Sequence, residues 1–319
     1  MNNDVWVLFD DRAGNNNQSE SLAKLITKSY QIKHLKYNKF INLPSLLHFS
    51  SLIGINKDAK TQIASPWPNI VISAGRRGAI TARFIKKQSP TTKLIQIMWP
   101  GYGAADFDHI ILPEHDNYDA PNIIKIIGAL TSINQEMLLR VKENSPRFSI
   151  YKEPIIALLV GGKSKGGEFT TEHAKLLIKQ VNEIVTKKEA TLLVSTSRRT
   201  PAGVVELLRT ELKHSYFYEY GEQDNPYLEF LAYASEIIIT GDSISMCSEA
   251  CYSGKPVYIF APKDISSKKH RSFHQNLYAK HHALPLAEYF NESNHQALKL
   301  GSMDVLLARL GLSTVSVSL

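Results

Sequence analysis

The residues best suited to chemistry lie in a polar turn between two apolar runs, in the stretch TGDSISMCSEACYSGKPVYIF at 240–260. Gly241 permits a turn after the first run, and Ser243 and Ser245 lie at or just before the start of a short helix. Hydroxyl groups, unpaired first-turn N–H groups and the positive end of a helix together favour a bound diphosphate. Glu249 follows about one helical turn later, where its carboxylate can accept hydrogen bonds from two ribose hydroxyls. The alternative is a glutamate that only stabilises the helix start, by ~0.5 kcal/mol.

Two more polar loops follow β-like runs in the second half of the chain. The loop GGKSKGG, at 161–167, suggests a P-loop, but that motif requires a glycine where the chain has Ala157. What remains is a flexible loop whose backbone can approach a phosphate closely. The loop STSRRTP, at 195–201, places hydroxyl groups and two arginines before a helix. From these loops we expect nucleotide contacts from Gly161, Gly162, Lys163, Ser197, Arg198, Arg199, Ser243, Ser245, Met246 and Glu249.

The first half of the chain carries two loops of the same kind. DDRAGNNNQS, at 10–19, leads into a helix at its last two residues and is either a ligand loop or a turn capped by Ser19. SAGRRG, at 73–78, places two arginines at the start of a helix, where they can bind an anion or form a solvated basic turn. Asp10 and Asp11 are candidate general bases.

These loops belong to a regular alternation of β-like runs and amphipathic helices. The expected strands are 4–9, 31–35, 69–73, 93–97, 109–112, 155–160, 190–195, 215–219, 236–239 and 256–260. The expected helices are 17–29, 78–87, 132–143, 171–187, 201–212, 225–233, 245–253 and 272–281. Such alternation predicts parallel sheets covered on both faces. A polar, proline-containing break at 142–154 divides it, so we expect an α/β protein whose two Rossmann-like domains face each other across a cleft.

The expected bounds are an N-terminal domain at 1–148, a C-terminal domain at 149–300 and a tail at 301–319 that packs back on the N-terminal domain. A chain of 319 residues fits two domains, because single cores rarely grow beyond about 250–300 residues. Ligands of such sheets bind beyond the carboxyl ends of the strands, where the polar loops begin.

The composition is that of a globular protein with anionic partners. Hydrophobic residues make up 43% and charged residues 21%, with a net charge of +7 and a pI of about 9.1. This balance favours phosphates or an anionic phospholipid surface, while scattered basic residues and the lack of a known motif argue against nucleic acid. Two cysteines, Cys247 and Cys251, fit a reducing compartment and two small buried side chains. No metal site is expected, since no further ligands lie at a recognisable spacing.

Neither a signal peptide nor a membrane span is expected. The chain enters a strand directly after its first residues, and no run approaches the roughly 18 apolar residues of a transmembrane helix. The apolar segment 42–55 is either a buried helix or a surface that rests on a membrane. We therefore expect a cytoplasmic protein, peripheral on the inner face of the membrane if it acts on a lipid-linked compound.

Two stretches resemble the donor-nucleotide domain of GT-B glycosyltransferases such as the peptidoglycan N-acetylglucosaminyltransferase. They are the loop Gly161–Gly167 and the stretch Gly241–Pro256. The resemblance implies that Glu249 holds the ribose and that the Ser/Gly turn before it holds the diphosphate. HRSFHQNLYAKHHALPL, at 270–286, takes the place of the loop that faces the donor sugar, which implies sugar contacts from His274 and Gln275.

A second resemblance covers nearly the whole chain and is to the elongated-mitochondria fission-factor family of plants and its bacterial homologues. Its motifs match Asp11–Ser19 (with one extra or substituted position at Asn16 or Asn17), Pro113–Asp116, Ser195–Pro201, Asp224–Tyr227 and Asp242–Val257. The plant protein is associated with recruiting a dynamin-like GTPase to mitochondria. The Lys/Asn/Ile-rich usage of this chain is typical of a bacterial protein, which has no mitochondria to divide, so the GT-B resemblance carries more of the functional expectation.

The GT-B resemblance implies a glycosyltransferase that moves a hexosyl or N-acetylhexosaminyl group from a nucleoside-diphosphate sugar to an acceptor that is unknown and could be membrane-linked. No cofactor or metal is needed where basic residues or a helix end neutralise the leaving diphosphate. The N-terminal domain would bind the acceptor, and Asp11 is the candidate base, with His115 as its rival unless PEHD is only a strand-end turn. The alternatives are a non-catalytic scaffold that keeps the fold, and a sugar-nucleotide epimerase. The expected acceptor contacts are Arg12, Asn17, Gln18, Arg76 and Arg77.

Overall fold

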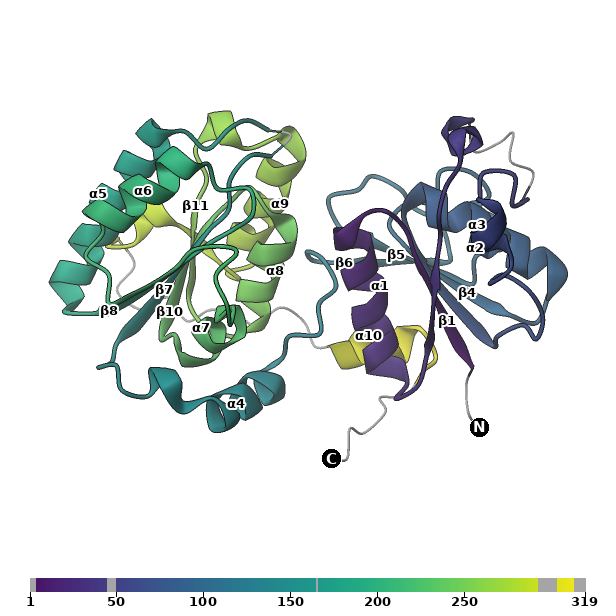
Figure 1. The fold of residues 1–319 in the computed structure, drawn as a ribbon, viewed down its shortest axis with the longest axis horizontal. Coiled ribbons are helices and arrows are strands. Elements are labelled where there is room, and N and C mark those ends of the chain that lie inside the picture. The colour runs from purple at the N-terminus through teal and green to yellow at the C-terminus, as the bar shows by residue number, and fades with distance from the viewer. Residues whose placement is uncertain (1–3, 45–49, 165, 292–302, 313–319) are drawn as a thin grey trace. The chain divides into compact units, whose positions relative to one another are not determined.

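The chain forms two units, each built on a six-stranded parallel sheet (Figure 1). One unit comprises Met1–Ser132 with Gly301–Leu319, and the other comprises Ile133–Leu300. The computed structural model describes residues 4–44, 50–164, 166–291 and 303–312. The expected α/β class with two Rossmann-like domains is confirmed.

The first unit has the strand order β2-β1-β3-β4-β5-β6. Its strands are β1 (Val5–Phe9), β2 (Gln31–His34), β3 (Ile70–Ala74), β4 (Lys93–Ile97), β5 (His109–Pro113) and β6 (Ile123–Ile126). Its helices are α1 (Ala13–Ile26), α2 (Lys57–Lys60), α3 (Gly75–Gln88) and α10 (Met303–Arg309), with 3-10 turns η1 (Lys39–Asn42) and η3 (Ala104–Asp106).

The second unit has the strand order β12-β11-β10-β7-β8-β9. Its strands are β7 (Ile155–Val160), β8 (Thr191–Thr196), β9 (Tyr216–Tyr218), β10 (Glu236–Thr240), β11 (Val257–Phe260) and β12 (Leu284–Pro285). Its helices are α4 (Gln135–Asn144), α5 (Thr171–Lys188), α6 (Ala202–Glu211), α7 (Tyr227–Tyr233), α8 (Ile244–Tyr252) and α9 (Lys268–Ala279), with 3-10 turns η4 (Pro146–Phe148), η5 (Lys263–Ile265) and η6 (Leu286–Glu288).

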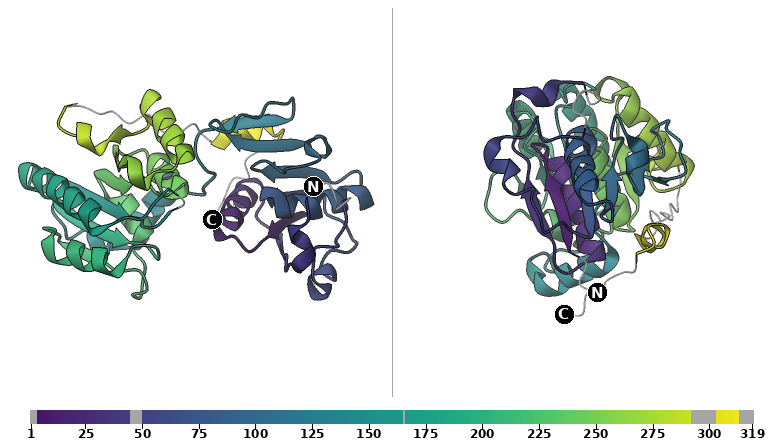
Figure 2. Two further views of the ribbon diagram at one scale, coloured as in Figure 1. Left: turned by 90° about the horizontal axis from the view of Figure 1, so that it is seen from above. Right: turned by 90° about the vertical axis from the view of Figure 1, so that its right-hand side faces the viewer.

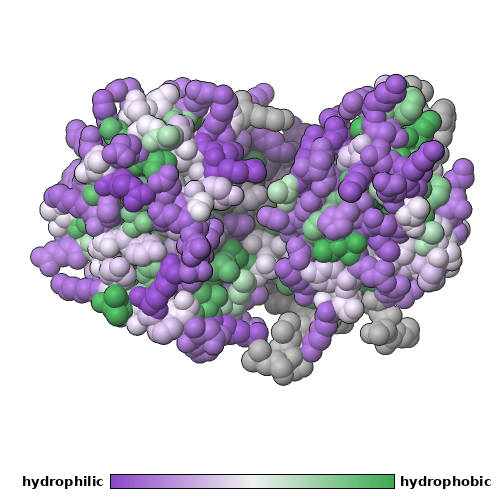
Figure 3. Space-filling model, viewed as in Figure 1, coloured by the Kyte–Doolittle hydropathy of each residue, from purple (hydrophilic) through white to green (hydrophobic). Residues whose placement is uncertain are grey.

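Helices cover both faces of each sheet, as Figures 1 and 2 show. Alternate residues of a strand point to opposite faces, so the central strands are apolar throughout, as in β7, whose residues are all buried. In the second unit, one face of the sheet packs on α5 and α6 in a single apolar cluster. In the first, α1 and α10 cover one face and α2 and α3 the other. Hydrophilic residues predominate on the surface seen in Figure 3.

The boundary between the units lies at Ser132/Ile133, before the expected position at residue 148. Helix α4 belongs to the second unit because it packs on α7, and the Tyr233 hydroxyl donates to the carbonyls of Lys142 and Ser145 at 3.1 and 3.0 Å. In the C-terminal segment, Leu306, Leu307 and Leu310 are buried in the core of the first unit.

Two helices of the first unit begin earlier than the sequence indicated. Helix α1 starts at Ala13, so most of the expected loop 10–19 is helical and Ser19 is a buried helix residue rather than a cap. Helix α3 starts at Gly75, directly after β3. The Asn16 amide explains the first case, since it accepts from the Asp10 N–H and donates to the Asp10 carbonyl at 2.9 and 3.0 Å. These bonds hold the strand end against the first turn of the helix.

The segment 42–55 lies partly outside the described residues, which omit 45–49. Its described part from 50 to 55 forms turns and ends at Ile55, which is buried against the sheet. Among the described helices, none combines the length and apolar character needed to span a membrane. Cys247 and Cys251 are both free and buried, as expected of small apolar side chains.

Candidate functional site

Each sheet reverses the direction of its strand order at one place, and the polar loops gather there. In the second unit this place lies between β7 and β10, and in the first between β1 and β3. Ligands of open parallel sheets bind beyond the carboxyl ends of the strands at such switch points. The topology therefore gives each unit one favoured ligand position.

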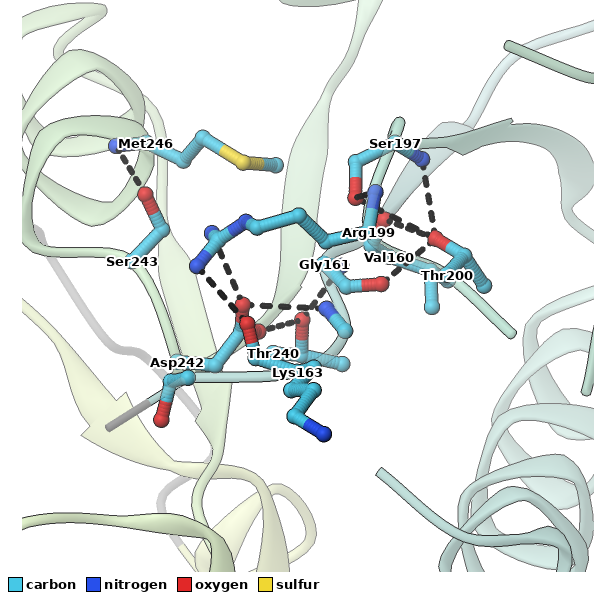
Figure 4. A network of polar contacts seen from close by, with 12 residues as sticks. Val160, Gly161, Lys163, Ser197, Arg199, Thr200, Thr240, Asp242, Ser243 and Met246 are labelled. Atoms are coloured by element: carbon cyan, nitrogen blue, oxygen red, sulfur yellow. Dashed lines mark hydrogen bonds and ion pairs between the residues drawn. The ribbon is translucent and has the colours of Figure 1, made fainter. Parts of the chain in front are cut away.

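The switch point of the second unit is organised by the buried carboxylate of Asp242, in the turn between β10 and α8 (Figure 4). Its side chain is 0% exposed. Oδ1 accepts from the Thr240 hydroxyl at 2.7 Å, and Oδ2 accepts from the Gly162 N–H and the Arg199 guanidinium, both at 3.0 Å. A buried charge is tolerated only when it is paired and hydrogen-bonded, and these contacts satisfy Asp242 from the end of β10 and from the loops after β7 and β8.

The loops of the second unit approach each other so closely that the loop after β7 needs glycine at two positions. A Cβ at Gly161 would lie 2.1 Å from Asp242 Oδ1, and one at Gly162 would lie 1.8 Å from the Arg199 carbonyl oxygen. The Lys163 N–H donates to that same carbonyl at 3.1 Å, and the Arg199 guanidinium donates to the Lys163 carbonyl at 3.1 Å. The loops after β7 and β8 are thus fixed to one another before any ligand is present.

Among the expected nucleotide contacts, the side chains of Lys163, Ser197, Arg199 and Ser243 have partners within the second unit. Arg199 is held by Asp242, and the exposed Lys163 amine pairs with Glu168. Ser197 accepts from the Arg199 N–H at 3.2 Å and forms a tight turn with Thr200. Ser243 is the N-cap of α8 and accepts from the Met246 N–H at 3.4 Å.

Arg198 and Ser245 differ from these residues because their side chains make no hydrogen bond or ion pair within the described part of the chain. Arg198 is exposed just after β8, and Ser245 lies in the first turn of α8. That turn contains no acidic residue. A free guanidinium and free first-turn N–H groups at one sheet edge favour an anion.

Glu249 lies on α8 and receives a hydrogen bond from a second expected motif. The Tyr227 hydroxyl, at the start of α7, donates to Oε2 of Glu249 at 2.6 Å. Oε1 has no hydrogen bond to a described residue. Burial raises the pKa of the Glu249 carboxyl, although the Tyr227 bond opposes this effect. The arrangement leaves one partly buried carboxylate oxygen free to accept from a ligand.

The two residues expected to face the donor sugar lie on α9 and differ in exposure. Gln275 is exposed, whereas His274 is 2% exposed and packs beneath the turn at Gly241. Burial lowers the pKa of His274 to about 4, so its ring is neutral near pH 7. His270, one turn earlier on α9, is half-buried and accepts or donates at 2.6 Å to Ser267. His270 is therefore the more accessible histidine of this helix.

The switch point of the first unit carries a pocket of about 290 Å³. Three of its lining residues are expected acceptor contacts, Arg12, Arg76 and Arg77. The other lining residues are Asp10, Asn15, Ile41, Asn42, Leu43, Pro44 and Ile80. The expected contacts Asn17 and Gln18 lie on α1 and do not line this pocket; Gln18 donates to the Gly14 carbonyl at 3.2 Å.

The candidate bases have different surroundings. Asp11 is 55% exposed, and its Oδ2 accepts from Arg77 at 2.7 Å. His115 lies in the turn after β5 with its side chain 2% exposed, its Nε2 3.9 Å from the Asp116 carboxylate. Asp10 lines the pocket, and burial raises its pKa against hydrogen bonds from Arg12 N–H and Asn15. Asp10 thus combines access to the pocket with a raised pKa.

Sequence reasoning missed the roles of Asp242, Tyr227 and Asn15. Asp242 and Tyr227 stand in motifs that were matched as whole stretches, and their contacts join loops separated by 43 and 22 residues. A buried acid directly after a strand was the available signal for Asp242. For Asn15 the signal was hidden, because the residue was assigned to a loop.

Sequence comparisons identify the family. The model of a family described as mitochondrial fission ELM1 matches residues 13–303. An uncharacterised protein of Rickettsia prowazekii is 34% identical over 326 aligned positions, which cover 91% of each chain. The mitochondrial fission protein ELM1 of Arabidopsis thaliana is 26% identical over 247 positions, covering 69% of this chain and 57% of the plant protein.

Comparisons with solved structures concern the fold. The UDP-GlcNAc 2-epimerase of Methanocaldococcus jannaschii, solved with UDP-GlcNAc and UDP, matches with a TM-score of 0.54 and 12% identity, covering 94% of this chain and 96% of that one. The glycotransferase of kitacinnamycin matches with a TM-score of 0.51 and 11% identity over 90% and 87% of the two chains. These proteins share the GT-B-like fold of two Rossmann-like domains. With the family model matching most of its length, this chain belongs to the mitochondrial fission ELM1 family.

Proposed function

We propose that the protein is a glycosyltransferase that uses a nucleoside-diphosphate sugar. The observation that carries this proposal is Glu249, whose Oε1 is free while Tyr227 holds Oε2. The start of α8 favours a diphosphate, and a carboxylate one turn further along can accept hydrogen bonds from ribose hydroxyls. The two features together therefore suit the two ends of a nucleoside diphosphate. Arg198, free and exposed at the neighbouring strand end, would add charge to the phosphate position.

The reaction proposed is displacement at the anomeric carbon of the donor sugar. An acceptor hydroxyl oxygen bonds to that carbon, the bond to the diphosphate oxygen breaks, and the nucleoside diphosphate leaves with the electron pair. The acceptor proton passes to a carboxylate, for which Asp10 is favoured over Asp11 and His115 because it lines the pocket and has a raised pKa. The α8 N-terminus and Arg198 would stabilise the leaving diphosphate without a metal.

An epimerase is the second candidate, because several proteins of similar fold are UDP-GlcNAc 2-epimerases. Such an enzyme would change the donor sugar in the absence of any acceptor. A scaffold of the kind suggested by the plant relative's name is the third, and it would not need either the nucleotide or the free carboxylate oxygen.

The test begins with thermal-shift and calorimetric titration of the full-length protein with UDP-, GDP-, ADP- and CMP-sugars. A ligand at 100 times its dissociation constant should stabilise the fold by roughly 2.7 kcal/mol. Failure of all four classes to bind would reject both enzyme hypotheses and leave the scaffold. With the bound donor, NMR of the sugar then separates the remaining two: interconversion without acceptor identifies an epimerase, and release of nucleoside diphosphate that requires an added acceptor identifies a transferase.

A further inference from the structure

The pocket at the switch point of the first unit combines a basic wall with an apolar wall. Arg12 follows β1, and Arg76 and Arg77 follow β3. Ile41, Leu43 and Ile80 belong to the same lining. The sequence gives no acidic residue in the first turn of either α1 or α3, and neither helix has a side-chain cap.

The three arginines differ in whether their side chains already have a partner in the protein. Arg77 donates to Asp11 at 2.7 Å and lies over the Tyr37 ring at 5.4 Å. Arg12 and Arg76 are exposed and make no side-chain hydrogen bond or ion pair with any residue in the described ranges. The pocket therefore holds two guanidinium groups whose charge is not balanced by a local salt bridge.

Asp10 is the carboxylate of the pocket lining, and both of its oxygens already accept a hydrogen bond from the protein. Its Oδ1 accepts from the Arg12 N–H at 2.8 Å and its Oδ2 from the Asn15 amide at 2.7 Å. Gly75 adopts φ +67°, and a Cβ there would lie 2.9 Å from the same Asn15 amide. The backbone of α3 thus approaches α1 closely enough for both helix starts to border the pocket.

We propose that this pocket binds a phosphate or diphosphate ester whose organic part has an apolar portion. Arginine forks match phosphate oxygens in a bidentate geometry, and N–H groups of helix starts add to the same field. The apolar wall of Ile41, Leu43 and Ile80 would contact the organic part. The inference rests on the proposed function in one respect: such a compound would be the sugar acceptor, with its hydroxyl near Asp10.

The experiment measures binding of a short-chain phosphatidic acid to the full-length protein by calorimetry at low ionic strength. The variants are Arg12→Ala/Arg76→Ala and, as a matched control, Arg309→Ala, an exposed arginine on α10 of the same unit. We expect the double variant to lose at least about tenfold in phosphatidic acid affinity, because each arginine supplies charge-assisted bonds. The control should bind as the parent does, and the melting temperature of both variants should be unchanged.

Hydrogen–deuterium exchange locates the bound anion. Phosphatidic acid should protect peptides covering 10–18 and 74–80, whereas a nucleotide sugar should protect 241–249. Protection by phosphatidic acid confined to 241–249, or equal affinity in parent and double variant, would overturn the pocket assignment. A loss of nucleotide-sugar binding in the double variant would contradict the division of roles, and a nucleotide sugar that fails to bind while phosphatidic acid binds would reject the proposed function but keep this pocket.

The phosphate ester could come from a bilayer lipid or from a free compound, and two forms of phosphatidic acid distinguish these sources. Vesicles of phosphatidylcholine containing phosphatidic acid test a bilayer lipid, and monomeric short-chain phosphatidic acid tests a free phosphate ester. Binding of both, reduced together in the double variant, indicates a lipid acceptor reached at a membrane. Binding of the monomer alone indicates a free acceptor, and retention of vesicle binding in the double variant shows that the membrane is contacted elsewhere.

Discussion

The Tyr227 hydroxyl lies 2.6 Å from Oε2 of Glu249 and joins two sequence motifs that are otherwise separate. Tyr227 begins α7, and Glu249 lies within α8. The bond orients the carboxylate and leaves Oε1 for a ligand. A glutamate that served only the helix start would not need a buried phenol to hold it.

Glu249→Gln should weaken nucleoside-diphosphate binding by roughly ten- to a hundredfold, because hydrogen bonds to a charged group contribute about 1.5–3 kcal/mol. Tyr227→Phe should have a smaller effect, since it frees the carboxylate without removing it. Pyrophosphate does not reach Glu249 and should bind parent and variants equally. Calorimetry with the diphosphate and with its 2′,3′-dideoxy analogue makes the comparison; if the analogue also distinguishes parent from Glu249→Gln, the ribose role is wrong.

Nucleotide-sugar affinity should fall on acidification at a pH above the ordinary carboxyl value of 4.5. Burial raises the pKa of Glu249, so its carboxylate becomes protonated early and loses an acceptor for the ribose hydroxyls. A nucleotide sugar is the suitable probe because its diphosphate is esterified at both ends and lacks the ionisation near pH 6 of a terminal phosphate. Protonation of His270 on acidification would instead raise the affinity, because it adds a positive charge that attracts the diphosphate. The difference between parent and Glu249→Gln therefore isolates Glu249, and parallel pH profiles would refute the idea.

Although Arg198 and Arg199 are adjacent, their substitution should have different effects: loss of Arg198 should reduce nucleotide affinity, and loss of Arg199 should reduce stability. Arg199→Ala leaves the buried Asp242 carboxylate without its guanidinium partner, and loss of one partner of a buried charge costs roughly 2–3 kcal/mol. Arg198→Ala removes an exposed side chain without a described partner and should change the free energy of unfolding by no more than about 0.5 kcal/mol. Its expected effect is a several-fold loss of nucleotide affinity. Urea denaturation and calorimetry on both variants test the assignment, and a destabilised Arg198→Ala with normal affinity would reverse it.

The strands were predictable because the central ones contain runs of buried β-branched and aliphatic residues, as in all of β7 and in the last four residues of β10. The short edge strand Ile123–Ile126 was missed, since only part of it is buried. Helix starts were the weaker prediction. Asparagine and glycine disfavour helices in isolation, whereas the bonds of Asn16 to Asp10 favour the early start of α1.

The position of the candidate site could be anticipated from loops after strands, but its internal contacts could not. Both candidate sites lie at switch points, which follow from strand order rather than from any local pattern. Whether an arginine binds a ligand or a buried acid depends on residues 43 positions apart, as Arg199 and Asp242 show. No local spacing distinguishes Arg198 from Arg199.

His274 should make the fold less stable as the pH falls from 6.5 towards 4. Burial lowers its pKa from 6.5 to about 4, helped by the nearby His270 and opposed by a hydrogen bond with the Gly241 backbone. Between these two values the unfolded chain binds a proton that the folded chain excludes, so the free energy of unfolding decreases by up to about 1.4 kcal/mol per pH unit. His274→Asn removes this contribution while other groups continue to titrate. Urea denaturation of parent and variant at several pH values gives the difference directly. We expect the parent to lose stability more steeply than His274→Asn below pH 6.5, whereas equal slopes would show that the ring is protonated in the folded protein.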